Sequence, residues 1–167
     1  YTLEADYYLD ESVNWTQLFT MGKDGSNYIV LANQGNPSLV KVGLTLATKK
    51  NGGAEDRVKS GSADVKLPVS EWAHLTYTQE GATGKLYINN ELVGTGTINT
   101  TPDDLSKVAG AGASIGRSLM FGDPGMVGKV DNFTILSRAK SEFEITGEEP
   151  PVEFVDDPIL NYTFEEN

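Results

Sequence analysis

Four short blocks between residues 71 and 145 carry the clearest structural signal in this sequence. They read EWAHLT (71–76), GKLYINNELV (84–93), SIGRS (114–118) and GKVDNFTILSRA (128–139). Each block has the length and composition of a β-strand and lies between turn-forming residues. Within the second block, Asn89 and Asn90 predict a tight type I′ hairpin turn, because asparagine tolerates a positive φ angle. The blocks therefore predict short strands joined by tight turns.

The rest of the chain continues this pattern. Apolar residues alternate with polar ones at Leu3, Ala5, Tyr7 and Leu9, and again at Val40, Val42, Leu44 and Leu46. Such alternation is typical of strands with one buried face, and many short strands in succession predict an all-β sandwich. The residues that we expect to be largely buried are Leu44, Leu46, Leu75, Leu86, Ile88, Phe133 and Ile135. A single helical turn, capped by Ser141, is expected over residues 141–145.

The chain divides into one main domain and a different C-terminal segment. Its 167 residues are enough for one domain with a real core. Residues 1–147 are assigned to the β-sandwich and residues 148–158, which are acidic and contain prolines, to a linker. Residues 159–167 return to apolar alternation. Because the sequence shows neither an initiator methionine nor a signal segment, we expect it to be a mature or excised piece of a protein.

Charge and composition exclude several classes of function. The net charge of −11 argues against a nucleic-acid or anionic-membrane partner, since both select surfaces rich in lysine and arginine. The chain has no cysteine, so it has neither disulfides nor thiol chemistry. No apolar run approaches the roughly 18 residues that a membrane-spanning helix needs.

The quoted blocks resemble the laminin-G-like, concanavalin-A-like jelly-roll domains that are appended to bacterial secreted glycoside hydrolases, including arabinofuranosidase-type enzymes. The resemblance covers roughly residues 3–145 and includes NWTQLFTMG (14–22), in which Gln17 stands where an arginine is common. It implies a two-sheet antiparallel jelly-roll sandwich. It also implies a bacterial protein that is secreted or displayed at the cell surface.

One departure from that family concerns its opening strand. Family members normally begin with a strand of the form Leu-x-Tyr-x-Phe-acidic, which is missing before Tyr1. The same pattern occurs near the C-terminus, as LNYTFEE (160–166). Either this segment folds back and completes the sandwich, or it begins a next module. We favour the fold-back, because an empty position in a sheet exposes unpaired backbone.

The resemblance implies a non-catalytic carbohydrate-binding or accessory module, whose partners are a glycan or polysaccharide and a neighbouring catalytic domain in the same chain. Two alternatives stay open: a protein-interaction or adhesion module, and a structural spacer. Sugar modules of this shape bind through aromatic and polar loop side chains. The candidate binding residues are Trp15, Tyr28, Asn33, Gln34, Asn36, Arg117, Phe121 and Asp123.

The carboxylates do not form a recognisable catalytic set. Glucanases of this fold carry three carboxylates on one strand, spaced Glu-x-Asp-x-x-Glu. The nearest approach here is Glu4 and Asp6, but the third position is Leu9. We therefore predict that the domain is not an enzyme. His74, which has no nucleophile beside it in the sequence, is interpreted as a structural residue of a strand.

Asp131 is the candidate metal ligand. It has the same strand parity as Phe133 and Ile135, which predicts that it points toward the core, where a carboxylate needs a partner. The resembling family commonly holds a calcium ion near this edge of the sandwich, so Asp131 with Asp123 or Glu165 is expected to form a structural Ca²⁺ site. The alternative is that Asp131 binds backbone amides at a strand end.

Overall fold

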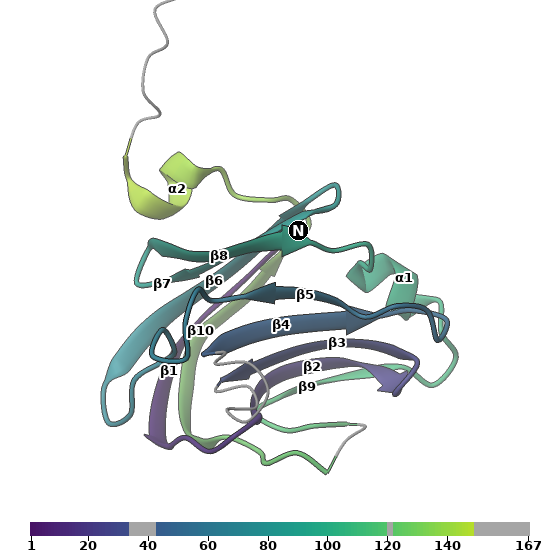
Figure 1. The fold of residues 1–167 in the computed structure, drawn as a ribbon, viewed down its shortest axis with the longest axis horizontal. Helices are drawn as coiled ribbons and strands as arrows, with labels where there is room; N and C mark the ends of the chain where they lie inside the picture. The colour runs from purple at the N-terminus through teal and green to yellow at the C-terminus, as the bar shows by residue number, and fades with distance from the viewer. Residues whose placement is uncertain (34–42, 120–121, 149–167) are drawn as a thin grey trace, which may run out of the picture.

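The computed structural model describes residues 1–33, 43–119 and 122–148, which form two five-stranded antiparallel sheets (Figure 1). In order, sheet A contains β10 (Val127–Leu136), β1 (Thr2–Glu11), β6 (Trp72–Glu80), β7 (Thr83–Ile88) and β8 (Glu91–Thr97). Sheet B contains β5 (Asp56–Lys59), β4 (Leu44–Lys49), β3 (Asn27–Asn33), β2 (Thr16–Asp24) and β9 (Gly112–Ile115). The predicted two-sheet, all-β sandwich is confirmed.

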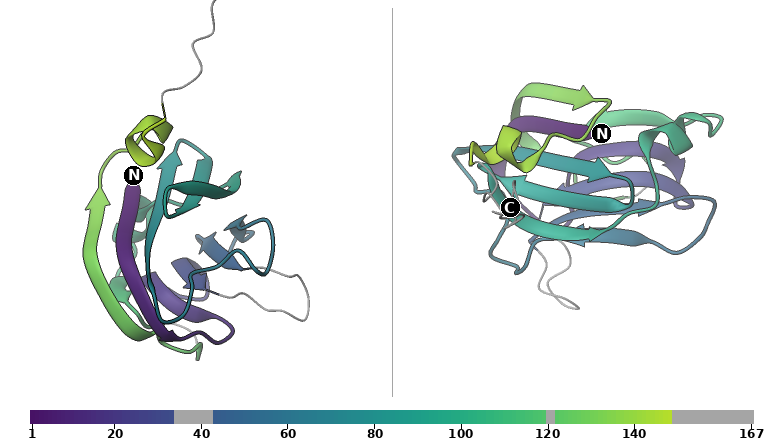
Figure 2. Two further views of the ribbon diagram at one scale, coloured as in Figure 1. Left: turned by 90° about the vertical axis from the view of Figure 1, so that its left-hand side faces the viewer. Right: turned by 90° about the horizontal axis from the view of Figure 1, so that it is seen from above.

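The core lies between the inner faces of the two sheets, and the long strands β1 and β10 curve around it (Figure 2). The alternating residues of β1 all face this core, and none of Leu3, Ala5, Tyr7 and Leu9 is more than 1% exposed. Burial of a leucine side chain such as those of Leu3 and Leu9 contributes roughly 1.5–3 kcal/mol. Alternation in the sequence therefore identified the buried face of this strand.

Six of the seven residues expected in the core do pack there. Leu44, Leu46, Leu75 and Leu86 are fully buried. Ile88 and Phe133 are half-buried and pack against the same cluster. The exception is Ile135, which is 50% exposed because β10 is the edge strand of sheet A among the described residues.

A β-bulge in β10 overturns the predicted orientation of Asp131. The pairing of β1 with β10 slips between Glu4 and Asp6, where β10 contains one extra residue. Asn132 lies in this bulge with a φ of 51°, a left-handed conformation that asparagine tolerates. The extra residue inverts the side-chain alternation of the strand. Asp131 consequently pairs with Asp6 and is exposed on the outer face of sheet A.

Two short helices flank the sheets, one of them as predicted. In α2 (Glu142–Thr146), Ser141 is the N-cap, and it exchanges hydrogen bonds with Glu144 in a capping box. The expectation of a single helical turn is wrong, because α1 (Pro102–Ser106) also forms. Thr101 caps α1 in the same way with Asp104, and a proline occupies the first turn. The sequence TPDD (101–104) therefore has the residues that favour the start of a helix.

The β7–β8 hairpin has the turn that its sequence predicts. Asn89 and Asn90 both have positive φ angles, 49° and 70°, as a type I′ turn requires. Val40, Val42 and the expected strand at 159–164 lie outside the described residues. No helix in the described ranges is both long and apolar enough to cross a membrane.

Candidate functional site

A depression on the outer face of sheet B gathers two aromatic rings and two carboxylates. Its volume is about 180 Å³, and its lining residues are Trp15, Tyr28, Val30, Ala47, Glu55 and Asp123. The floor follows from the strand register, because Tyr28 and Val30 alternate with core residues along β3, and Val30 pairs with Ala47 of β4. Strand β3 thus supplies core on one face and the floor of the depression on the other.

Trp15 forms one wall, and its backbone is held in an unusual conformation. Its φ angle is 62°, which is rare for a bulky residue. The turn is fixed by Thr16, whose backbone N–H and hydroxyl both donate to the carbonyl of Val13, at 3.1 and 2.8 Å. The side-chain amide of Gln17 donates to the Trp15 carbonyl at 3.1 Å. Strained backbone persists where the surroundings fix it, often at binding sites.

Glu55 connects the two aromatic residues of the depression. One of its carboxylate oxygens accepts a hydrogen bond from the hydroxyl of Tyr28, and the other accepts one from the Nε–H of Arg57. The guanidinium carbon of Arg57 lies 5.6 Å from the centroid of the Trp15 ring, a cation–π arrangement. Burial, reinforced by Glu55, raises the pKa of Tyr28. The phenol therefore stays protonated at neutral pH.

Asp123 also lines the depression, and it is held through the buried side chains of Gln17 and Thr20. Its Oδ2 accepts the side-chain amide of Gln17 at 3.3 Å, and Oε1 of Gln17 accepts the hydroxyl of Thr20 at 3.2 Å. The backbone N–H of Gln17 donates to the carbonyl of Pro124 at 2.9 Å, which fixes the segment that carries Asp123. Burial raises the pKa of Asp123. Hydrogen bonds within the protein thus hold the side chains of the depression in place.

This arrangement has the chemistry of a site for a small polyhydroxylated ring. Aromatic faces accept the apolar face of such a ring, while carboxylates accept its hydroxyl protons. The volume of about 180 Å³ is below the ~300–1,000 Å³ of typical small-molecule pockets. We therefore expect the depression to hold one ring of a longer ligand.

Three of the predicted binding residues come together here, namely Trp15, Tyr28 and Asp123. Arg117 is exposed and is not part of the lining. Gln34, Asn36, Phe121 and Glu165 lie outside the described residues. Glu55 was not predicted, because it lies in a short polar segment between strands, where nothing in the local pattern marks it.

The structure contradicts the prediction that Asn33 is a ligand-binding residue. It points to the inner side of sheet B and is fully buried. Its side-chain nitrogen donates to the Ser12 hydroxyl at 3.0 Å and to the Leu67 carbonyl at 3.1 Å, and its oxygen accepts the Leu67 N–H at 2.9 Å. The side chain therefore joins two loops to the end of β3 and presents nothing to a ligand.

The predicted calcium ligands do not assemble among the described residues. Asp123 lies on the outer face of sheet B, whereas Asp131 lies on the outer face of sheet A. Oδ1 of Asp131 accepts the backbone N–H of Asn132 at 2.8 Å, which is the amide-binding alternative. Within the described ranges, no three histidine, cysteine, aspartate or glutamate residues are placed to hold a metal ion. These residues do not fit a Ca²⁺ ion at Asp131, and calcium stays a prediction.

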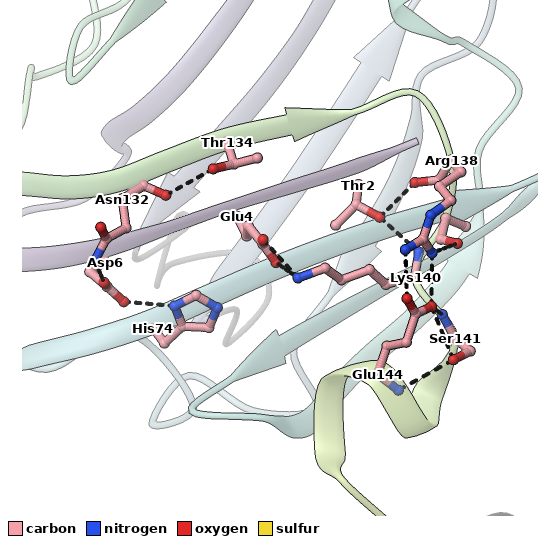
Figure 3. Close-up of polar contacts among 11 residues, drawn as sticks. Thr2, Glu4, Asp6, His74, Asn132, Thr134, Arg138, Lys140, Ser141 and Glu144 are labelled. Carbon is pink, nitrogen blue, oxygen red and sulfur yellow. Dashed lines mark hydrogen bonds and ion pairs between the residues drawn. The ribbon is translucent and has the colours of Figure 1, made fainter.

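Glu4 and Asp6 point outward from β1, on the face of sheet A away from the core (Figure 3). The carboxylate of Glu4 forms an ion pair with Lys140, with Nζ–O distances of 2.7 and 2.6 Å. Oδ1 of Asp6 lies 2.6 Å from Nδ1 of His74. Both carboxylates are therefore engaged by neighbouring side chains.

Solved structures with the same fold include sugar complexes. Domain 4 of AbnA, a GH43 extracellular arabinanase from Geobacillus stearothermophilus in complex with arabinotriose, matches with a TM-score of 0.67 and 23% identity, over 87% of this chain and 64% of that one. The CBM40 of a Ruminococcus gnavus IT-sialidase, bound to α2,3-sialyllactose, matches with a TM-score of 0.67 and 14% identity, over 87% and 80% of the two chains. At these identities the likeness shows a shared fold.

A comparison with curated protein sequences gives no match. The family model described as the concanavalin A-like lectin/glucanases superfamily matches residues 1–146. That range contains both sheets, both helices and the depression on sheet B. The chain therefore belongs to the concanavalin A-like lectin/glucanases superfamily.

Proposed function

We propose that this domain is a non-catalytic carbohydrate-binding module that binds glycan through the depression on sheet B. The observation that carries the proposal is the placement of Trp15 and Tyr28 beside Glu55 and Asp123 in one pre-organised site. The proposal is supported by the arabinotriose and sialyllactose complexes of domains with the same fold. Because fold alone does not determine function, the proposal rests on the residues of the site.

The charges of the site favour a neutral sugar over an acidic one. The described lining carries two carboxylates and no cationic side chain, and the nearby Arg57 is already paired with Glu55. The whole chain has a net charge of −11, which also repels anionic ligands. We therefore propose neutral pentose or hexose polysaccharides as the ligand class.

The proposed role is to raise the local concentration of substrate for a catalytic domain in the same secreted protein. A weak interaction with the polysaccharide is enough, because the tether converts later encounters into intramolecular ones. Secretion and the neighbouring catalytic domain are parts of this proposal.

A glycan array, followed by calorimetric titration with the best soluble ligand, tests the site. We expect Trp15→Ala to weaken binding about tenfold or more, since aromatic stacking contributes about 0.5–1.5 kcal/mol beyond the buried area. Phe143→Ala is the control, because this exposed aromatic residue lies on α2 and does not line the depression. Wild-type protein that binds no glycan, or a Trp15→Ala variant that binds as wild type does, would refute the proposal.

A second measurement tests the absence of catalysis. We expect the purified domain to release no reducing sugar from arabinan, xylan or β-glucan. Turnover that disappears in Glu4→Gln or Asp6→Asn would contradict this expectation, since these residues are the nearest approach to a catalytic carboxylate pair.

A further inference from the structure

The outer face of sheet A carries two adjacent cross-strand rows with different chemistry. Strand register places Trp72, Tyr8 and Lys129 side by side on β6, β1 and β10. The next outward-facing row, two residues further along each strand, contains His74, Asp6 and Asp131. Residues two apart along a strand are separated by about 6.8 Å. An aromatic row therefore lies beside a polar row at the spacing of one sugar ring with its hydroxyls.

Trp72 is the open aromatic surface of the first row. It is 49% exposed, although it is one of the largest apolar side chains in the chain. Its ring contacts Tyr8 at a centroid distance of 5.6 Å, tilted by 59°. Nζ of Lys129 lies 5.0 Å from the centroid of the Tyr8 ring. Because Lys129 and Trp72 both lie against Tyr8, the free face for stacking is that of Trp72.

The polar row is fixed by its own hydrogen bonds (Figure 3). Oδ1 of Asp6 lies 2.6 Å from Nδ1 of His74, and its Oδ2 accepts the side-chain amide of Asn132 at 2.6 Å. The bond from Asn132, together with the neighbouring His74, lowers the pKa of Asp6, so this carboxylate is ionised at neutral pH. The bulge at Asn132 is also what turns Asp131 toward this row.

A depression lies along the polar row and beside Trp72. It has a volume of about 420 Å³ and is lined by Asp6, Trp72, Ala73, His74 and Asp131. At the other end of the same face, Lys85 forms an ion pair with Glu142 of α2. The depression lies on the outer face of sheet A, on the opposite side of the sandwich from Trp15.

We propose that this depression is a second glycan-binding site, which takes one ring of a neutral oligosaccharide stacked on Trp72. Asp6 and Asp131 accept hydroxyl protons from the sugar, and His74 supplies a further polar contact through Nε2. The two carboxylates disfavour acidic sugars here as well. With sites on both outer faces, the domain holds two glycan chains at once, which raises its avidity for an insoluble polysaccharide.

The chain has two tryptophans, and each belongs to one of the two sites, so their indole N–H signals in a ¹⁵N NMR spectrum report the sites separately. Arabinotriose, xylotriose and cellotriose serve as neutral probes, and sialyllactose serves as the acidic one. We expect the Trp72 signal to shift and saturate with at least one neutral probe. In Trp15→Ala, the apparent Kd at Trp72 should stay within about twofold of wild type.

The outcomes separate this proposal from the one for sheet B. If only the Trp15 signal titrates, the second site is refuted and the function proposed above stands. If only the Trp72 signal titrates, the second site stands and the sheet B site is refuted. If neither signal shifts, both sites are refuted. His74→Ala should weaken the Trp72 titration at least threefold, while Phe143→Ala should leave it unchanged. Equal affinity in His74→Ala would overturn the role of the polar row.

Discussion

Replacement of Asn33 by alanine should destabilise the domain without a direct effect on sugar binding. The amide of Asn33 satisfies both the N–H and the carbonyl of Leu67, which is itself buried. Alanine leaves these two backbone groups without a partner in the interior, at about 1–3 kcal/mol each. The bond to Ser12 adds little, since that side chain is only half-buried and water can replace the amide. The expected loss in the free energy of unfolding is therefore about 2–6 kcal/mol.

Thermal and urea unfolding measure this loss directly. For a domain of this size, about 1 kcal/mol corresponds to roughly 2–4 °C in Tm, so a loss of about 3 kcal/mol lowers Tm by roughly 6–12 °C. Asn14→Ala is the control, because Asn14 is exposed and such surface changes usually stay within about 0.5 kcal/mol. A variant with wild-type Tm would refute the structural role. Loss of sugar affinity in protein that is still fully folded would return Asn33 to the set of ligand residues.

The remaining predictions concern metal binding, pH and the C-terminal segment. If calcium binds, EDTA lowers Tm, added Ca²⁺ restores it and Asp131→Ala abolishes the response; an unchanged melt would exclude a stabilising calcium ion. The ion pair with Arg138 lowers the pKa of Glu144 to about 2, so its stabilising effect is complete above the unfolded pKa near 4.5 and disappears as pH falls toward 2. An NMR titration in which this carboxyl has an ordinary pKa would contradict that ion pair. Truncation after residue 149 should lower Tm if residues 159–164 complete the sandwich, whereas an equal Tm would assign them to a next module.

The bulge in β10 shows where the reasoning from sequence fails. Alternation assigns one face to every second residue, so Asp131 and Phe133 were expected to share the core side. One additional residue around Asn132 reverses the faces on which the side chains lie. This bulge costs little free energy because asparagine adopts a left-handed conformation easily. Nothing in the local sequence distinguishes a strand with this bulge from a regular strand. The pairing with β1, more than 120 residues away, decides it.

The sequence by itself determined the features that depend on neighbouring residues. Alternation identified the buried face of β1, two asparagines specified the hairpin turn, and Ser141 with Glu144 specified the start of α2, because each of these acts within a few residues. The candidate site arises differently. Trp15, Glu55 and Asp123 come from three separate loops, and they meet only because β2, β3, β4 and β5 are neighbours in one sheet. Strand order is set by packing of the whole core, so only the tertiary structure brought these side chains together, and only it turned Asn33 inward.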